Sequence, residues 1–330
     1  MTRLQLALAC GDYDRTRALE DGSIRPDGID LTYLRLPVEE TFFRMLRHRE
    51  FEVAEMSFSS YVVSLQSDDP PFIALPVFTS RMFRHGSIFI NTAAGISTPA
   101  DLSGRKVGTP EFQVSAGVWI RGILADYHDL AVDDVTYFTG GQESPGRIEK
   151  AGLDLPDSIR IESIGPDQTL SAMLAEGEID ALYTPRIPSP FAARDPRVGR
   201  LFPEVIDAET AYFAESGIFP IMHVVVIRRD VYDRFPWVAQ SLHKAFVAAK
   251  EQVRDRLYDS SALRFMLPWL NQYLEETDAI LGDDYWSYGL GANYDTLATF
   301  LRYHHDQGLS KRQLEPAELF APESTESALI

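Results

Sequence analysis

Cysteine, lysine and long apolar runs are scarce in this chain of 330 residues. The single cysteine, Cys10, excludes an internal disulfide framework and a zinc site built on cysteines. No stretch approaches the roughly 18 consecutive apolar residues that a membrane-spanning helix needs. The apolar run over residues 4–10 is also too short for the core of a signal peptide. We therefore expect a cytoplasmic protein with Cys10 packed in its core.

Basic residues are the minority among the charged ones, with 31 Lys and Arg against 49 Asp and Glu and a net charge of -18. Nucleic acids and anionic membranes bind basic surfaces, so this balance argues against both as partners. Among the basic residues, 26 are arginines and only 5 are lysines. Guanidinium groups bind carboxylates well, although a GC-rich coding bias would produce the same excess.

Strand and helix periodicities alternate along the chain, which is typical of an α/β protein. The length is about twice that of a usual single domain, so we expect two lobes. Strands are predicted over residues 4–10, 29–36, 51–56, 72–78, 87–91, 133–138, 159–164 and 222–227. Helices are predicted over residues 39–48, 111–127, 169–176, 236–257, 262–274 and 294–307. We expect a mixed segment over residues 203–220 and little order after residue 314.

Two phrases in the middle of the chain resemble the type II periplasmic-binding-protein fold. Residues 99–108 (PADLSGRKVG) resemble the entry to the second lobe of that fold, and residues 177–181 (GEIDA) resemble its exit strand. The resemblance implies two lobes, each a mixed sheet flanked by helices, with a ligand cleft between the lobes. We expect residues 1–95 and 218–330 to form the first lobe and residues 96–217 to form the second.

A second resemblance covers nearly the whole chain. The matching stretches are residues 9–16 (ACGDYDRT), 76–85 (PVFTSRMFRH), 118–122 (VWIRG), 140–147 (GGQESPGR), 185–186 (PR), 219–223 (FPIMH), 286–290 (WSYGL) and 299–303 (TFLRY). With these the chain resembles the 4,5-dihydroxyphthalate decarboxylase family. The resemblance implies non-oxidative decarboxylation of 4,5-dihydroxyphthalate to 3,4-dihydroxybenzoate and CO2 in phthalate catabolism, without an organic cofactor.

Two other functions remain open at this point. Proteins of this appearance also serve transporters, so a solute-binding protein for a small aromatic carboxylate, without catalysis, is the main alternative. A cytoplasmic enzyme on the same fold that acts on another small acid is the third. In each case the partner is a small acid, with neither nucleic acid nor membrane. The aromatic residues near the C-terminus could build either a core or the face of a homodimer.

Candidate ligand residues follow the predicted strands, because α/β folds bind ligands at the carboxyl ends of strands. In the first lobe, Asp12, Tyr13 and Arg15 follow the first strand. Ser59 opens a helix whose free N–H groups favour a carboxylate, although a plain helix cap is equally expected. The densest group lies further along, where two arginines could clamp a dicarboxylate or simply form a solvated basic loop. This group is Arg81, Phe83, Arg84 and His85.

The second lobe supplies a further set of substrate-binding candidates. Glu111, Gln113 and Ser115 are expected to open a long helix, a second anion-accepting N-terminus. Trp119 lies farther along this helix, where a core position is the more common one. The remaining candidates are Arg147, in a glycine-rich loop, and Arg186, after a strand.

The decarboxylation implied by the family needs an acid that protonates a ring carbon. His85 is the first candidate, because histidine titrates near neutral pH. His223, at the start of a buried strand, is the second, although either histidine could be structural. Glu111 is a candidate partner for a substrate hydroxyl, or a favourable first-turn charge. His304 and the residue after it are expected at the surface.

A metal site is not expected from local spacing. A catechol could chelate a divalent ion, and Asp12, His85, Glu111 and His223 could in principle converge. The chain lacks HxxxH and HxxE spacings, however. We therefore expect neither a metal nor another cofactor.

Overall fold

The computed structural model describes residues 3–149 and 152–325, which form two compact units. Unit 1 comprises Met1–Arg81, Ile221–Leu297 and Leu314–Ile330, and unit 2 comprises Met82–Pro220 and Ala298–Gln313. The sequence predicted that the chain first passes from one lobe to the other after residue 95. In the structure this crossing comes earlier, because the strand β5 (Ile88–Asn91) already pairs with strands of the unit 2 sheet. Residues 298–313 also belong to unit 2 instead of the first lobe expected from the sequence.

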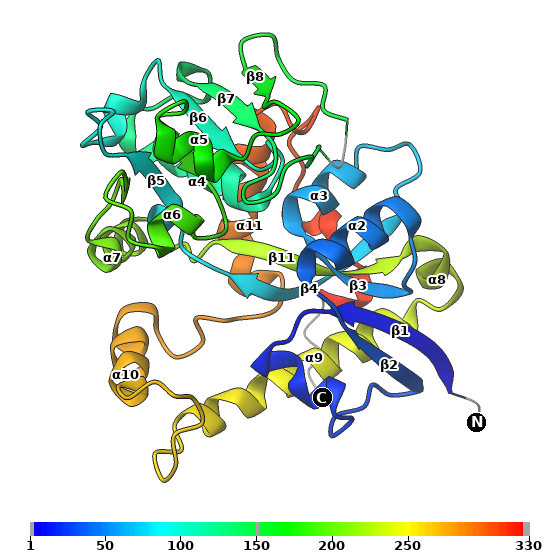
Figure 1. The fold of residues 1–330 in the computed structure, drawn as a ribbon. Helices are drawn as coiled ribbons and strands as arrows, with labels where there is room; N and C mark the ends of the chain where they lie inside the picture. Colours follow the sequence, from blue (N-terminus) through cyan, green and yellow to red (C-terminus); the bar gives the residue numbers. More distant parts are fainter. Residues whose placement is uncertain (1–2, 150–151, 326–330) are drawn as a thin grey trace. The chain divides into compact units, whose positions relative to one another are not determined.

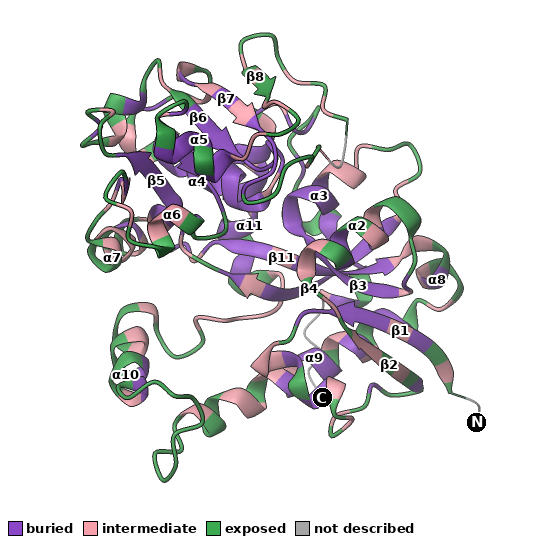
Figure 2. Ribbon diagram, viewed as in Figure 1, coloured by how far each residue is buried: buried purple, intermediate pink, exposed green. Residues whose placement is uncertain are grey.

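Unit 1 is built on a mixed five-stranded sheet in the order β2-β1-β3-β11-β4 (Figure 1). The strands are β1 (Leu4–Cys10), β2 (Ile29–Arg35), β3 (Val53–Ser57), β4 (Phe72–Arg81) and β11 (Ile221–Arg228). β1 runs parallel to β2 and β3, whereas β11 is antiparallel to both of its neighbours. Every residue of β3 is buried, and Figure 2 shows this central strand in the colour of buried residues.

Helices cover this sheet through apolar stripes. The longest, α9 (Trp237–Leu257), presents Val238, Leu242 and Phe246 at helical spacing to a core that includes Leu8 and Val225. The other helices of unit 1 are α1 (Arg17–Glu20), α2 (Val38–His48), α3 (Phe58–Ser64), α8 (Arg229–Arg234) and α10 (Leu270–Leu281). Short 3-10 turns at Asp14–Thr16, Gly291–Asn293, Pro316–Leu319 and Pro322–Ser324 complete the unit.

Unit 2 contains a six-stranded mixed sheet in the order β10-β5-β9-β6-β7-β8. Besides β5, its strands are β6 (Lys106–Thr109), β7 (Thr136–Thr139), β8 (Arg160–Ser163), β9 (Ala181–Tyr183) and β10 (Val198–Arg200). Its helices are α4 (Ser115–His128), α5 (Leu170–Glu176), α6 (Ser189–Ala192) and α7 (Val205–Ser216), and α11 (Tyr294–Asp306) begins in unit 1 and ends in unit 2. Short 3-10 turns lie at His85–Ser87, Pro99–Leu102 and Val132–Asp134. The α/β class expected from the sequence is confirmed.

The structure corrects several local expectations. The segment over residues 203–220 is largely the helix α7. The helix expected over residues 262–274 begins only at Leu270, because a proline at position 268 cannot occupy a helix interior. The chain after residue 314 is ordered as far as residue 325 and pairs with β4, where the Ala321 N–H donates to the carbonyl of Ala74 at 2.9 Å. The last five residues lie outside the described ones.

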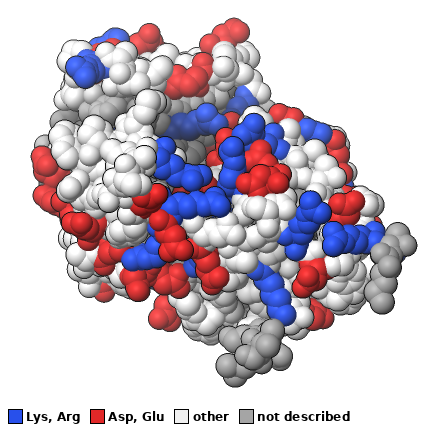
Figure 3. All heavy atoms as spheres, turned by 90° about the horizontal axis from the view of Figure 1, so that it is seen from below, with Lys and Arg blue, Asp and Glu red and all other residues white. Residues whose placement is uncertain are grey.

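The described residues include no helix with both the length and the apolar character that a membrane crossing requires. Charge is mixed on the face of the molecule that Figure 3 shows, where acidic and basic side chains are interspersed.

Candidate active site

A buried carboxylate occupies the middle of the sheet in unit 1. Glu55 lies on β3 with no exposed surface, and its neighbours on that strand are apolar or small. A buried charge is costly unless hydrogen bonds compensate it. Here Oε1 accepts hydrogen bonds from the Tyr13 hydroxyl at 2.8 Å and the Thr79 hydroxyl at 2.9 Å. Oε2 accepts one from the Gly11 N–H at 3.0 Å. Glu55 is therefore held by the loop after β1 and by β4.

The fourth partner of this carboxylate is a histidine. Nδ1 of His223 lies 2.7 Å from Oε1 of Glu55. β11 pairs with β3 so that Val225 is opposite Glu55, which places His223 two residues away on the same face. On its other side, the pairing of β11 with β4 shifts register on both sides of His223. Such irregularities turn a side chain to a new direction and are common beside active sites.

Charge and exposure separate the two members of this pair. Burial alone would raise the pKa of Glu55, but the hydrogen bond and charge of His223 and the N–H of Gly11 outweigh it and lower the pKa to about 2. Glu55 is therefore ionised, and Nδ1 of His223 must carry the proton that it shares with the carboxylate. The His223 side chain is 18% exposed, whereas the Glu55 side chain is at 0%. Nδ1 of His223 is thus engaged with Glu55, and the second ring nitrogen takes no part in this contact.

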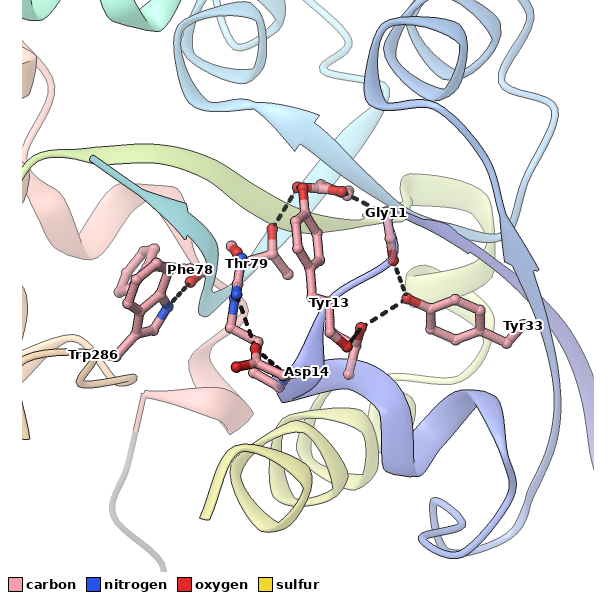
Figure 4. Close-up of polar contacts among 10 residues, drawn as sticks. Gly11, Tyr13, Asp14, Tyr33, Phe78, Thr79 and Trp286 are labelled. Carbon is pink, nitrogen blue, oxygen red and sulfur yellow. Dashed lines mark hydrogen bonds and ion pairs between the residues drawn. The ribbon is translucent and has the colours of Figure 1, made fainter. Parts of the chain in front are cut away.

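The loop after β1 is shaped around Tyr13 (Figure 4). Gly11 carries no side chain, and a Cβ atom there would lie 2.7 Å from the Tyr13 ring, so the close approach needs glycine. Burial and the neighbouring Glu55 raise the pKa of Tyr13 far above its ordinary value, so its hydroxyl keeps its proton and donates it. Tyr33 supports the loop from β2 by donating to the Gly11 carbonyl at 2.7 Å. The loop therefore presents a fixed donor to Glu55.

Arg15 lies beside this network with its guanidinium between two aromatic rings. Its Cζ is 4.1 Å from the centre of the Tyr13 ring and 4.4 Å from that of Trp286. Nε donates to the Thr79 carbonyl at 2.6 Å, and Nη1 pairs with Asp14 at 3.1 Å. Arg15 and Trp286 also line a cavity of about 410 Å³ within unit 1. A cation is therefore held rigidly at the wall of a cavity.

The other unit 1 residues expected at the site have structural partners. Arg81 is buried, and its Nη2 donates to the carbonyl of Ser287 at 2.9 Å and to Asn293; burial lowers the pKa of Arg81 to about 9. Ser59 is buried in α3. Asp12 pairs with Arg35 at 3.2 Å on exposed surface. Arg81 therefore fastens the segment that follows Trp286.

Phe83, Arg84 and His85 lie near the start of unit 2, where Phe83 is half-buried and the other two are buried. The Phe83 ring lies 4.8 Å from that of Phe219. Arg84 is buried, which lowers its pKa to about 10. His85 packs against Phe202, with ring centres 5.2 Å apart, and burial followed by the charge of His128 lowers the pKa of His85 to about 4. At neutral pH His85 is therefore uncharged.

A polar group in unit 2 gathers around Glu111. This carboxylate is buried and pairs with Nη2 of Arg147 at 2.6 Å. Glu111 and Gln113 precede α4 instead of opening it, and only Ser115 is at the helix start. Gln113 and Ser115 are buried.

The remaining two candidates of unit 2 lie in different surroundings. Arg186 is exposed, and its carbonyl accepts a hydrogen bond from Gln142 at 3.3 Å. Trp119 is fully buried against the ring of Phe300, with centres 5.4 Å apart. These placements do not test the expected roles, which remain predictions.

The sequence predicted some residues of this network but not its central carboxylate. Tyr13, Arg15 and His223 were expected and do lie around one network. Glu55 and Thr79 were not, although a single glutamate in an otherwise apolar strand was a visible signal. Cys10 is fully buried, as expected, and burial and the charge of Glu55 raise the pKa of its thiol. His304, expected at the surface, is buried and shares a hydrogen bond with Ser310.

Within residues 3–149 and 152–325, no group of three or more His, Cys, Asp or Glu side chains is arranged to hold a metal ion. The groups at the centre of the network are the side chains of a glutamate and a histidine and the hydroxyls of a tyrosine and a threonine.

Comparison with solved structures defines the class of the fold. The chain superposes on the periplasmic sulfonate-binding protein SsuA of Methylobacillus flagellatus with a TM-score of 0.54 and 14% identity, covering 98% of this chain and 93% of that one. The alkanesulfonate-binding protein SsuA of Xanthomonas axonopodis gives a TM-score of 0.53 and 14% identity, with 97% and 99% covered. The protein therefore has the two-sheet α/β fold of periplasmic binding proteins.

Sequence comparison identifies the family. The 4,5-dihydroxyphthalate decarboxylase of Comamonas testosteroni is 40% identical over 330 residues, covering 100% of both chains. That of Pseudomonas putida is 45% identical over 202 residues, 61% of this chain and 78% of the relative. No protein-family model matches the chain. The chain belongs to the 4,5-dihydroxyphthalate decarboxylase family, which is a family of carboxy-lyases.

Proposed function

We propose that this protein removes one carboxylate from 4,5-dihydroxyphthalate, giving 3,4-dihydroxybenzoate and CO2, with His223 as the general acid. The relatives' activity supports the reaction. The single observation that carries the site is the 2.7 Å hydrogen bond between His223 Nδ1 and the buried, ionised Glu55. This pair lets an imidazole hold and deliver a proton.

The chemistry follows from the substrate. Each carboxylate of 4,5-dihydroxyphthalate has a ring hydroxyl para to it, which donates electron density to the carbon that carries the carboxylate. That carbon takes a proton from His223 and forms a C–H bond. The bond to the carboxylate then breaks, its electron pair returns to the ring, and CO2 leaves as aromaticity is restored. One proton is consumed in each turnover, and solvent returns it to the imidazole.

In the proposed mechanism each residue of the network has a role. Glu55 stabilises the protonated imidazole and fixes its orientation, while Tyr13 and Thr79 are positioning residues that act through Glu55. Arg15 offers a rigid guanidinium to the carboxylate that is retained.

His223 suits the acid role better than His85. A pKa of about 4 leaves His85 without a proton to give at neutral pH. The rings of Phe202 and Tyr212 surround His85, whereas His223 forms a hydrogen bond with the carboxylate of Glu55.

The test is turnover by the purified protein and by His223→Asn. We expect the wild type to form 3,4-dihydroxybenzoate and CO2 in equal amounts, and the variant to lose about 10²- to 10⁴-fold in kcat. His305→Asn, at a side chain that is 41% exposed, is the matched control and should keep wild-type rates. Binding of the substrate without turnover by the wild type would favour the solute-binding alternative, and full activity of His223→Asn would move the acid role elsewhere.

The proposal also includes a cytoplasmic location and a reaction without cofactor or metal. The relationship to decarboxylases supports the location, and cell fractionation tests it. The reaction is redox-neutral, and the para hydroxyl provides the electron density that a cofactor would otherwise supply. We expect the rate to be unchanged after dialysis against a chelator, and a rate restored only by added metal would contradict this.

A further inference from the structure

A short apolar segment of unit 1 is exposed between α9 and α10. Among the described residues, fifteen large apolar side chains are exposed, and six of these lie within residues 263–273, which we call the apolar arm. Met266 has an exposed fraction of 105%, and Trp269 one of 62%. Figure 2 shows the exposed and half-buried colours along this part of the chain. The six side chains are Leu263, Phe265, Met266, Leu267, Trp269 and Tyr273.

Polar contacts hold the two helices that carry the arm. Nη2 of Arg254 on α9 pairs with Asp278 on α10 at 2.6 Å, and the hydroxyl of Tyr258 also donates to Asp278. Of the α10 residues, only Leu270 and Leu274 are buried. The helices are thus fastened through charged groups, and most of the apolar side chains of the arm are left facing solvent. Concentrated apolar surface of this kind marks a site of association.

Charge identifies the partner. The arm carries one charged residue, Arg264, in a chain with a net charge of -18. Two copies of so acidic a chain repel each other, so they can approach closely only through a segment that is poor in charge. A basic partner would bind to acidic surface, because the nearly uncharged arm offers it no electrostatic attraction. The arm therefore fits a second copy of this chain.

The available area agrees with this assignment. Large side chains bury about 150–250 Å² each when fully covered. At their observed exposures, the six side chains of the arm offer roughly 700 Å² per copy. A stable protein interface buries about 600–1,000 Å² on each partner. One arm meeting the same arm of a second copy across a two-fold axis would reach that range.

We propose that the apolar arm is the surface through which two copies of this chain associate. The test is sedimentation velocity over a concentration series up to about 100 μM. We expect the wild type to sediment at twice 37.1 kDa or a larger multiple. The double variant Met266→Glu/Trp269→Glu should sediment at 37.1 kDa, because charge within the arm would be buried unpaired.

The matched control is Ile206→Glu, which introduces the same charge at a side chain on α7 that is 69% exposed. This variant should associate like the wild type. Tyr273→Glu provides a second disruption, and circular dichroism shows that each variant is folded. A wild type that sediments at 37.1 kDa throughout would overturn the proposal, as would association that survives both disruptions. Binding of the monomeric wild type to neutral phospholipid vesicles would assign the arm to a membrane surface instead.

Discussion

His223 and Glu55 form a pair in which one partner is fully buried and the other is partly exposed. The carboxylate is at 0% exposure and the imidazole at 18%, with 2.7 Å between Oε1 and Nδ1. The buried partner carries negative charge, and in the proposed function the partly exposed partner passes a proton to the substrate. Because Glu55 accepts three further hydrogen bonds at 2.8–3.0 Å, it cannot rotate away from the histidine.

The first prediction concerns the charge of Glu55. Glu55→Gln keeps the shape but removes the charge that stabilises the protonated His223. Loss of a hydrogen bond to a charged group costs about 1.5–3 kcal/mol, so we expect kcat to fall roughly 10- to 150-fold with a small change in KM. The measurement is steady-state kinetics of 3,4-dihydroxybenzoate formation. Glu40→Gln, on exposed surface of α2, is the control, and equal rates in both variants would refute the role of Glu55.

Long apolar patterns predicted the main elements of the fold closely. The helix expected over residues 236–257 is observed as Trp237–Leu257, and the strand expected over residues 222–227 as Ile221–Arg228. These elements are set by their own periodicity, which is local information. The contact of Ala321 with Ala74 joins residues far apart in the chain, and nothing in the local sequence indicates it.

The candidate site was predictable only in part, for a related reason. Loops after strands drew attention to Tyr13 and Arg15, because a fold of this class binds ligands there. Glu55 lies inside a strand, and a rule about the loops after strands does not include it. Its importance comes from the loop after β1, β4 and β11, which converge on one carboxylate, and such convergence exists only in three dimensions.

The second prediction tests whether Thr79 positions Glu55. Thr79→Val is nearly isosteric but loses the hydroxyl that donates to Oε1 at 2.9 Å. We expect a loss of about 1–2 kcal/mol in the free energy of unfolding, and a lower kcat with little change in KM. Thr79→Ser retains the hydroxyl and should restore kcat. If Thr79→Ser were as slow as Thr79→Val, packing of the methyl group would be the cause instead.

The third prediction concerns Arg15 and the retained carboxylate. Arg15→Met removes a guanidinium that is held between Tyr13 and Trp286. A charge-assisted hydrogen bond is worth about 1.5–3 kcal/mol, so KM should rise roughly 10- to 150-fold while kcat changes less. Arg17→Met is the control, since Arg17 is exposed and pairs only loosely with Asp12 at 3.7 Å. Equal KM values in the two variants would show that Arg15 does not bind the retained carboxylate.

The last prediction follows from the buried imidazole of His85, whose pKa is lowered to about 4 from an ordinary value of 6.5. The folded state binds this proton less readily than the unfolded state does. The contribution of the uncharged His85 to the free energy of unfolding is therefore complete above pH 6.5. It is lost as the pH falls from 6.5 to 4, and its magnitude is on the order of 3 kcal/mol. His85→Phe should flatten the decline of Tm over this window, because the new ring does not titrate.

The measurement for His85 is thermal unfolding followed by circular dichroism between pH 7.5 and 4, a range chosen to bracket both pKa values. His128 also has a lowered pKa, so the Tm of the variant will still fall somewhat as the pH falls. His305→Phe makes the same substitution at an exposed position and should follow the wild-type curve. A decline in His85→Phe as steep as that of the wild type would mean that folding does not lower the pKa of His85. The acid role expected for it from the sequence would then regain its physical basis.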